Sequence, residues 1–289
     1  MAFDPFLYVA LGAGVLVGRL VHRRTPWTGR ATRATIVILV GLLGTLLDAV
    51  PVGSLALALP ISLAFALLIL GATAGLFLLL SPEGPPTSGT SAAREVRERI
   101  PFGGVLVAAV AGGFVVGRFV ALPSEAGITW ALYVMLVLIG FDLKLEWVRI
   151  RWLTVPLTSA AAAAVGSAVL FAVVTGVPWS VSFATSFAFG WYSLAGPLVA
   201  ARAGALFGLL AFLTNFFREN LTMILSPSIG RRLRGGGLAA IGGATSMDTT
   251  LYFITRYGDE NAGSLALAIG LVLTLTAGLV LPALLALPL

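Results

Sequence analysis

Apolar residues fill most of the chain in long runs that short polar stretches separate. Most runs approach or exceed the length of about 20 residues that an α-helix needs to cross a bilayer. The pattern therefore predicts an all-α fold, a polytopic membrane helix bundle. Its apolar segments are Phe6–Val21, Ala34–Val50, Leu55–Leu80, Phe102–Ala121, Ile128–Leu143, Leu153–Gly176, Val181–Ala200, Leu206–Ile229, Leu238–Ile254 and Leu265–Leu285.

One apolar segment is interrupted by the stretch Gly242–Thr250, which contains two adjacent glycines, four hydroxyl residues and Asp248. Each glycine lowers helix stability by about 1 kcal/mol relative to alanine, and hydroxyl side chains such as Thr245 and Ser246 can bond the freed backbone groups. An acid inside a membrane segment is costly and marks a functional site by default. The stretch predicts a broken helix with a substrate or ion site. The alternative is a packing kink with Asp248 near the surface.

A second interruption is predicted in the segment Val181–Ala200. Phe189 and Gly190 precede Trp191, Tyr192 and Ser193, and Gly196 and Pro197 follow them. Proline removes a backbone donor and glycine weakens the helix, so this segment is a second candidate for a broken helix. An aromatic belt at the membrane interface with a proline kink is the alternative interpretation.

A polar stripe runs along the otherwise apolar segment Leu206–Ile229. The stripe occupies about 100° of a helical wheel, so we expect it to face the interior of the bundle. Neutralisation of Arg218 by Glu219 is the alternative to a site role for these two residues. The stripe consists of Asn215, Arg218, Glu219, Thr222 and Ser226.

Two further acids lie near the ends of apolar segments. Asp48 follows Gly41, Gly44 and Thr45 on one helical face, where small residues let another helix or a ligand approach. Asp48 is therefore a candidate site residue, with an interfacial acid before Pro51 as the alternative. Asp142 is interpreted as an acid at the level of the lipid headgroups.

A weak internal repeat relates the first six apolar segments. Each unit contains three spans, and an odd number of spans inserts the two copies with opposite orientation, as in many secondary transporters. We interpret residues 1–289 as a single membrane transporter domain with repeat units at 5–80 and 101–176 and a broken-helix region at 180–289. The matching positions are Gly14–Val21 with Gly113–Val120, Gly44 with Gly140, and Pro60 with Pro156.

Composition supports a membrane protein and excludes several kinds of site. Hydrophobic residues make up 58% of the chain and charged residues 10%, and the mean hydropathy is +1.02. The chain has no cysteine, and its single histidine, His22, lies beside arginines, so we expect neither a cofactor nor a metal site. The net charge of +6 comes from arginines in short loops, which indicates a lipid bilayer and not nucleic acid as the partner.

The arginines also bear on topology. If all ten segments cross the membrane, the arginines at 231–234 lie outside, against the positive-inside rule. If Val181–Ala200 and Leu238–Ile254 re-enter from opposite sides instead, those arginines lie inside, at the cost of placing Arg202 outside. Charge favours this arrangement of eight crossings with both termini outside; ten crossings with discontinuous helices is the alternative.

Three blocks together resemble the signature of the lysine exporter LysO family: Phe189–Gly196, then Arg218–Glu219, then Gly242–Thr250. Their order and spacing also fit, and the similarity extends over most of the chain. The resemblance implies export of L-lysine and of toxic analogues such as thialysine, driven by an ion gradient and dependent on the intramembrane acids Asp48 and Asp248. It also implies the cytoplasmic (inner) membrane of a prokaryote. One departure is Leu194–Pro197, which reads Leu-Ala-Gly-Pro where Leu-Ser-Gly is expected.

The chemistry of the candidate residues agrees with a secondary transporter for L-lysine or a related cationic amino acid. Carboxylates can pair with the ammonium groups, and an aromatic ring can add a cation–π contact of roughly 0.5–2 kcal/mol. Arg218 or backbone N–H groups can meet the ligand carboxylate. A buried carboxyl can also carry the coupling proton, which gives antiport. The candidate site residues are Asp48, Trp191, Tyr192, Ser193, Asn215, Arg218, Glu219, Thr245, Ser246 and Asp248.

Two rival classes have different sequence requirements. A monovalent cation/proton antiporter would use the same broken helices and acids, and it is the alternative function. An intramembrane aspartyl protease would need paired Tyr-Asp and Gly-x-Gly-Asp motifs, and neither occurs in the chain. Glu95 and Glu98 lie in a polar loop, which disfavours a glutamate-based protease, so we expect no enzyme.

Overall fold

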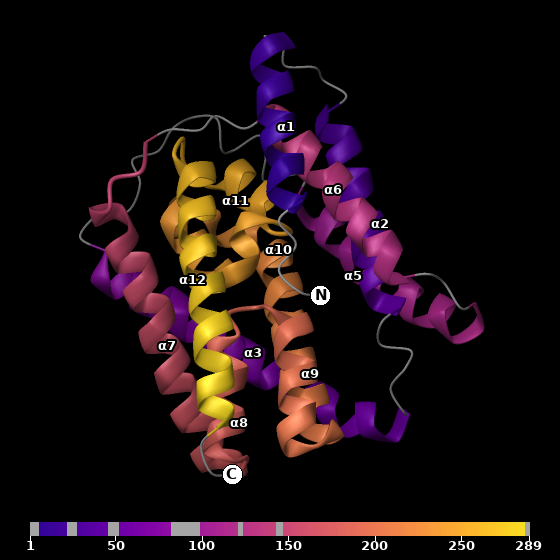
Figure 1. Cartoon of the computed structure of the whole chain (residues 1–289), viewed down its shortest axis with the longest axis vertical. Helices are drawn as coiled ribbons and strands as arrows, with labels where there is room; N and C mark the ends of the chain where they lie inside the picture. The colour runs from indigo at the N-terminus through magenta and orange to yellow at the C-terminus, as the bar shows by residue number, and fades with distance from the viewer. Residues whose placement is uncertain are drawn as a thin grey trace. The chain divides into compact units, whose positions relative to one another are not determined.

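A computed structural model describes residues 6–21, 28–45, 52–81, 99–120, 124–142 and 147–286, and every regular element in these ranges is a helix (Figure 1). Asp48 lies outside the described residues, so its predicted site role is not addressed by the structure. The helices are α1 (Phe6–Val21), α2 (Thr28–Thr45), α3 (Val52–Leu80), α5 (Arg99–Phe119), α6 (Ser124–Asp142), α7 (Arg151–Thr175), α8 (Trp179–Phe187), α9 (Tyr192–Ala203), α10 (Ala205–Gly242), the 3-10 helix η2 (Gly243–Met247), α11 (Leu251–Tyr257) and α12 (Ala262–Leu285).

Three of the described helices are long and apolar enough to cross a membrane, namely Gly53–Leu80, Arg151–Thr175 and Ala262–Leu285. Shorter apolar helices cover Val9–Leu20 and Thr129–Phe141. Many large apolar side chains on these helices are exposed, such as Leu79 at 82% and Leu279 at 78%. Because lipid tails are as apolar as leucine, such surfaces suit a bilayer. The chain is therefore a multi-pass membrane protein.

The described helices form two compact units. One unit contains α1, α2, α5 and α6. Within it, α1 packs against α6, and α2 packs against both α5 and α6. Glycines allow the closest of these approaches: a Cβ at Gly14 or Gly18 of α1 would overlap the backbone of Val137 or Phe141 of α6. Helices pack this closely in membranes through small residues.

The second unit contains α3 and all helices from α7 onward. Near one end of this unit, the Phe65 and Phe171 rings stack at 3.8 Å, and the Ser62 hydroxyl donates to the Leu210 carbonyl (3.2 Å). Near the other end, Gly236 of α10 lies against Pro156 of α7 and Phe77 of α3. These contacts make α3 parallel to the first part of α10 and antiparallel to α7.

Two helical hairpins enter this unit from its opposite ends. α8 begins at the end where α7 finishes, and α9 returns to that end, where Arg202 Nε donates to the Leu285 carbonyl (2.9 Å). α10 leaves from the same end and reaches the other, where the backbone of Arg234 is non-helical (φ 53°, ψ −168°). Residues 235–242 then run back into the unit, and α11 leads out again to Tyr257, beside Gly230.

Among the differences between the helices and the predicted segments, two concern the elements of the candidate site. α10 continues past Ile229 through Arg231 and Arg232, so these arginines are helical and not part of a loop. Pro197 was expected within the interruption, but it lies inside α9. Pro197 is the sixth residue of α9, beyond its first turn, and the proline does not break the helix at this position.

Candidate functional site

The two hairpins turn at interruptions that contact each other inside the second unit. The α8–α9 interruption covers residues 188–191, and the Ala244 N–H, from the other interruption, donates to the Phe189 carbonyl (2.8 Å). Gly190 and Gly243 both have positive φ, of 94° and 69°, a conformation that glycine adopts without strain. A Cβ at Gly243 would also overlap the Phe189 carbonyl. The glycines that predicted the interruptions therefore also permit their contact.

Asn215 holds the α8–α9 interruption to α10. Its Oδ1 accepts from the Gly190 N–H (2.8 Å), and its Nδ2 donates to the carbonyls of Thr185 (3.0 Å) and Ala211 (2.9 Å). The side chain is fully buried. Asn215 therefore supplies partners for backbone groups that the helix break would leave unsatisfied in a dry interior.

Arg218 has the matching role at the other interruption. Its Nε and Nη2 donate to the carbonyls of Ile241 (3.1 Å) and Ala240 (3.2 Å), at the end of α10. Its guanidinium also lies 5.7 Å from the centre of the Phe189 ring. A cation at a helix C-terminus is stabilised by the exposed carbonyls and the helix dipole. Nη1 is buried without a hydrogen-bond partner, so one donor group of Arg218 stays available.

We predict that Arg218→Ala lowers the stability of the protein more than it changes the affinity for substrate. The variant leaves two buried carbonyls without charged donors, which costs at least about 2 kcal/mol. Thermal unfolding in detergent and the apparent transport affinity of the remaining protein measure the two effects. Normal thermal stability with a clearly weakened affinity would instead assign Arg218 to the substrate carboxylate.

Glu219 follows Arg218 in sequence but has a different environment. It is fully buried, and neither carboxylate oxygen has a hydrogen-bond partner in the described part of the chain. Arg218 points its donors to the end of α10, so the two residues do not neutralise each other as an ion pair. The Thr249 hydroxyl lies beside Glu219 but donates to Asp248 Oδ1 (3.2 Å). A buried carboxylate without partners needs a cation or a proton to offset its charge.

Asp248 lies close enough to Glu219 for the two carboxylates to repel each other when both are charged. Asp248 is partly exposed and accepts a hydrogen bond from the Thr249 N–H. Tyr192, at the start of α9, is within electrostatic range of both acids. The structure thus brings together three predicted site residues from three different segments: Tyr192, Glu219 and Asp248.

Thr245 and Ser246 stabilise the second interruption. The Thr245 hydroxyl donates to the Gly242 carbonyl (2.9 Å), and the Ser246 hydroxyl lies within bonding distance of the carbonyls of Gly243 (2.8 Å) and Ala266 (2.9 Å). The Ala266 contact attaches η2 to α12, where a Cβ on Gly270 would collide with Ser246. Both hydroxyls thus have backbone partners, as the sequence analysis expected of this stretch.

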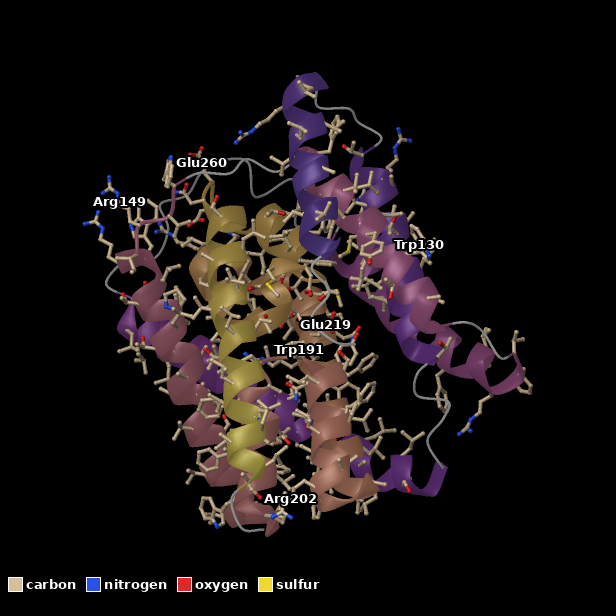
Figure 2. All side chains as sticks on the ribbon, in the orientation of Figure 1. Trp130, Arg149, Trp191, Arg202, Glu219 and Glu260 are labelled. Atoms are coloured by element: carbon tan, nitrogen blue, oxygen red, sulfur yellow. The ribbon has the colours of Figure 1, made fainter. Side chains whose placement is uncertain are left out.

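Trp191 and Ser193 are partly exposed at the start of α9, beside Tyr192. In Figure 2, Trp191 and Glu219 both lie near the middle of the unit, with Arg149 and Glu260 at one end and Arg202 at the other. Phe212 and Phe216 of α10, whose rings pack against Tyr192, were not among the residues predicted from the sequence. Their spacing of four residues, followed by Glu219 three residues later, was the available signal.

Comparison with known proteins agrees with this arrangement. The LysO protein of Escherichia coli K12, named "Lysine exporter LysO", is 29% identical over 184 residues, which are 62% of this chain and 61% of that protein. A "Putative lysine exporter" of Haemophilus influenzae is 33% identical over 96 residues, which are 33% of this chain and 49% of that protein. The chain thus aligns with less than two thirds of the length of either relative. No solved structure matches it.

The family model described as "Lysine exporter LysO" matches residues 107–285, more than half of the chain. The matched range contains both interruptions, the stripe on α10 and the acids Glu219 and Asp248. The resemblance found in the three sequence blocks is thereby confirmed, and the chain belongs to the lysine exporter LysO family of membrane transporters.

Proposed function

We propose that this protein exports L-lysine and its toxic analogues across the cytoplasmic membrane by proton-coupled antiport. The observation that carries the proposal is the unpartnered, fully buried Glu219 carboxylate beside Asp248, where two interrupted helices meet. The names of the two relatives point to the same substrate. Intramembrane acids between broken helices are typical of ion and substrate sites in secondary transporters.

Competition for the acid pair explains the coupling. Two neighbouring carboxylates repel each other when both are charged, and either an ammonium group between them or a proton on one of them relieves this repulsion. Lysine and proton then exclude each other from the same site. If lysine occupies the acid pair on the way out and a proton occupies it on the way back, the two are exchanged by antiport. No second ion site is then needed. Asp48 remains a further candidate acid for the transport site, as expected from the sequence.

We further propose that the two hairpins are re-entrant and enter the bilayer from opposite faces. Irregular backbone at membrane depth persists only when it is enclosed by protein or lines a wet cavity. The burial of residues 242–247 and the hydrogen bonds of Asn215 and Arg218 support such a location. Four helices of this unit, α3, α7, the first part of α10 and α12, then cross the membrane completely.

The packing of the helices supports the inverted repeat. α1 packs against α6 and α2 against α5, so the first helix of each proposed copy contacts the second helix of the other. The third helices, α3 and α7, pack against each other in antiparallel orientation and carry Pro60 and Pro156. Two copies inserted with opposite orientation would produce this exchange of partners.

Charge predicts which end of the second unit faces the cytoplasm. One end carries Arg149, Arg151, Arg231, Arg232, Arg234 and Arg256, whereas Arg202 lies at the other end. By the positive-inside rule, the arginine-rich end is cytoplasmic. In this cysteine-free chain, we expect Arg231→Cys to react with an impermeant maleimide only from the inside, and Arg202→Cys only from the outside. Labelling of Arg231→Cys in intact cells would overturn this topology.

Uptake of radiolabelled lysine into everted membrane vesicles tests the proposed transport. Uptake is expected to depend on a proton gradient, to be competed by unlabelled lysine and to be insensitive to sodium. Arginine and ornithine serve as graded competitors because they keep the cationic side chain. Sodium-stimulated proton release without lysine uptake would identify a monovalent cation/proton antiporter instead.

A further inference from the structure

One face of α10 carries aromatic rings in line with the buried acid. Phe212, Phe216 and Glu219 follow one another at spacings of four and three residues, which places them on the same side of the helix. The rings of Phe212 and Phe216 are nearly parallel, with centroids 5.9 Å apart. The column extends about 10 Å along the helix from Phe212 to Glu219, at about 1.5 Å per residue.

Tyr192 closes this column from the side of α9. Its ring meets Phe212 edge to face at 5.2 Å and Phe216 at 5.9 Å. Tyr192 is also within electrostatic range of Glu219 and Asp248. Tyr192 therefore contacts both apolar rings and lies within electrostatic range of the acid pair, which places an apolar surface near the carboxylates.

The two phenylalanines differ in burial, and this difference separates their roles. Phe216 is 1% exposed and belongs to the packed interior, whereas Phe212 is partly exposed at the end of the column away from Glu219. α9 leaves space for Phe212 at Gly196, where an added Cβ would lie 3.0 Å from the Phe212 Cβ. The position of the Phe212 ring therefore depends on the absence of a side chain at Gly196.

We propose that Tyr192 and Phe212 bind the aliphatic part of the substrate side chain, and that Phe212 sets the length of cationic side chain that the site accepts. This inference rests on the proposed function. In this arrangement the terminal ammonium group of the substrate lies at the acid pair, and the methylene groups of the substrate lie along the rings. Phe212 forms the end of the binding surface away from the acids. A lysine side chain suits such a surface because it is apolar along its stem and charged only at its tip.

The physical basis of selectivity is the fixed distance between the far ring and the acids. A shorter diamino acid cannot reach the carboxylates while keeping its contacts with Phe212, and a longer or bulkier one collides with the ring. One methylene in a closely fitting apolar site changes selectivity by roughly 10- to 200-fold. Truncation of Phe212 removes the boundary, and the site then accepts longer cationic side chains.

The test measures inhibition of lysine uptake in everted vesicles by ornithine, lysine, homolysine and arginine, for the wild type and for Phe212→Ala. We expect the wild type to prefer lysine over homolysine and arginine. Phe212→Ala is expected to improve the inhibition by homolysine and arginine relative to lysine by about tenfold or more. Unchanged ratios in Phe212→Ala would overturn the inference.

Two further variants keep the test decisive. Gly196→Ala retains Phe212 but displaces its ring, and we expect it to shift the same ratios; this result decides the question if Phe212→Ala does not assemble. Phe183→Ala removes an aromatic ring of α8 that contacts Trp179 and Phe187, and its ratios are expected to match those of the wild type. A similar shift in Phe183→Ala would also overturn the inference.

The failure of the proposed function would look different. Absence of proton-dependent lysine uptake by the wild type would contradict lysine export itself. Lysine uptake by the wild type, with unchanged ratios in Phe212→Ala and Gly196→Ala, would contradict only the role of Phe212.

Discussion

Glu219→Gln is expected to abolish lysine export while leaving the protein folded and inserted. The glutamate is fully buried, and its oxygens have no hydrogen-bond partner among the described residues, so no bond that holds the fold depends on its charge. Glutamine has nearly the same shape but can neither pair with an ammonium group nor release a proton. Loss of a hydrogen bond to a charged group costs about 1.5–3 kcal/mol, or roughly 10- to 150-fold in affinity. Loss of the exchangeable proton should remove the remaining transport.

Growth in the presence of thialysine measures this effect in a host that lacks its own exporter. We expect the Glu219→Gln strain to be as sensitive as the empty host, with normal amounts of protein in the membrane. Thr222→Val is a matched control on the same helix because the Thr222 hydroxyl carries no charge and bonds backbone carbonyls, those of Arg218 (2.8 Å) and Ile241 (3.5 Å). Full resistance of the Glu219→Gln strain would show that neither substrate nor proton binds at this carboxyl.

Asp248→Asn is expected to insert and fold normally but to lose most lysine export. Asparagine keeps the oxygen that accepts from the Thr249 N–H, so the backbone of the interruption retains its local hydrogen bond. The variant removes one of the two charges of the acid pair. Without repulsion between two charged carboxylates, binding of an ammonium group between them is less favourable. We expect Asp248→Glu to retain part of the activity because it keeps the charge and displaces it by one methylene group.

Asp142→Asn is the matched control for this experiment because it neutralises an acid at the end of α6 and should export lysine nearly as well as the wild type. Resistance to thialysine and the amount of membrane protein are compared for all three variants. Wild-type resistance with Asp248→Asn at normal expression would place the substrate elsewhere. Equal losses in Asp248→Asn and Asp142→Asn would indicate a general effect of charge and not a site.

Both interruptions are predictable from the sequence because their causes are local. Adjacent glycines and clustered hydroxyls destabilise a helix wherever it packs, so the break in Gly242–Thr250 was identified without a structure. The other break was predicted from Pro197 and the glycines on either side of Trp191 and Tyr192; it lies at Gly190, whereas Pro197 is inside α9. The stripe on α10 was identified for a similar reason, since polar side chains in an apolar segment must avoid lipid. The five stripe residues are indeed fully buried.

The separate roles of neighbouring residues in that stripe were not predictable. Arg218 and Glu219 are adjacent, and helical geometry alone allowed them to neutralise each other. The partners of the two side chains depend on residues 235–242, the second part of α10. This part returns beside the first part after the non-helical residue Arg234. Because that return supplies the carbonyls of Ala240 and Ile241, Arg218 is bonded and Glu219 is left without a partner.

The sequence by itself determined that this is a helical membrane protein of the lysine exporter LysO family, and where its helices break. Hydrophobicity, helix propensity and short motifs are properties of neighbouring residues, so they can be read along the chain. Only the tertiary structure decided that the two breaks touch, that Tyr192 lies within electrostatic range of Glu219 and Asp248, and that Phe212 and Phe216 pack against Tyr192. These contacts join segments far apart in sequence, and they follow from close packing that glycines such as Gly196 and Gly243 permit and that no local pattern specifies.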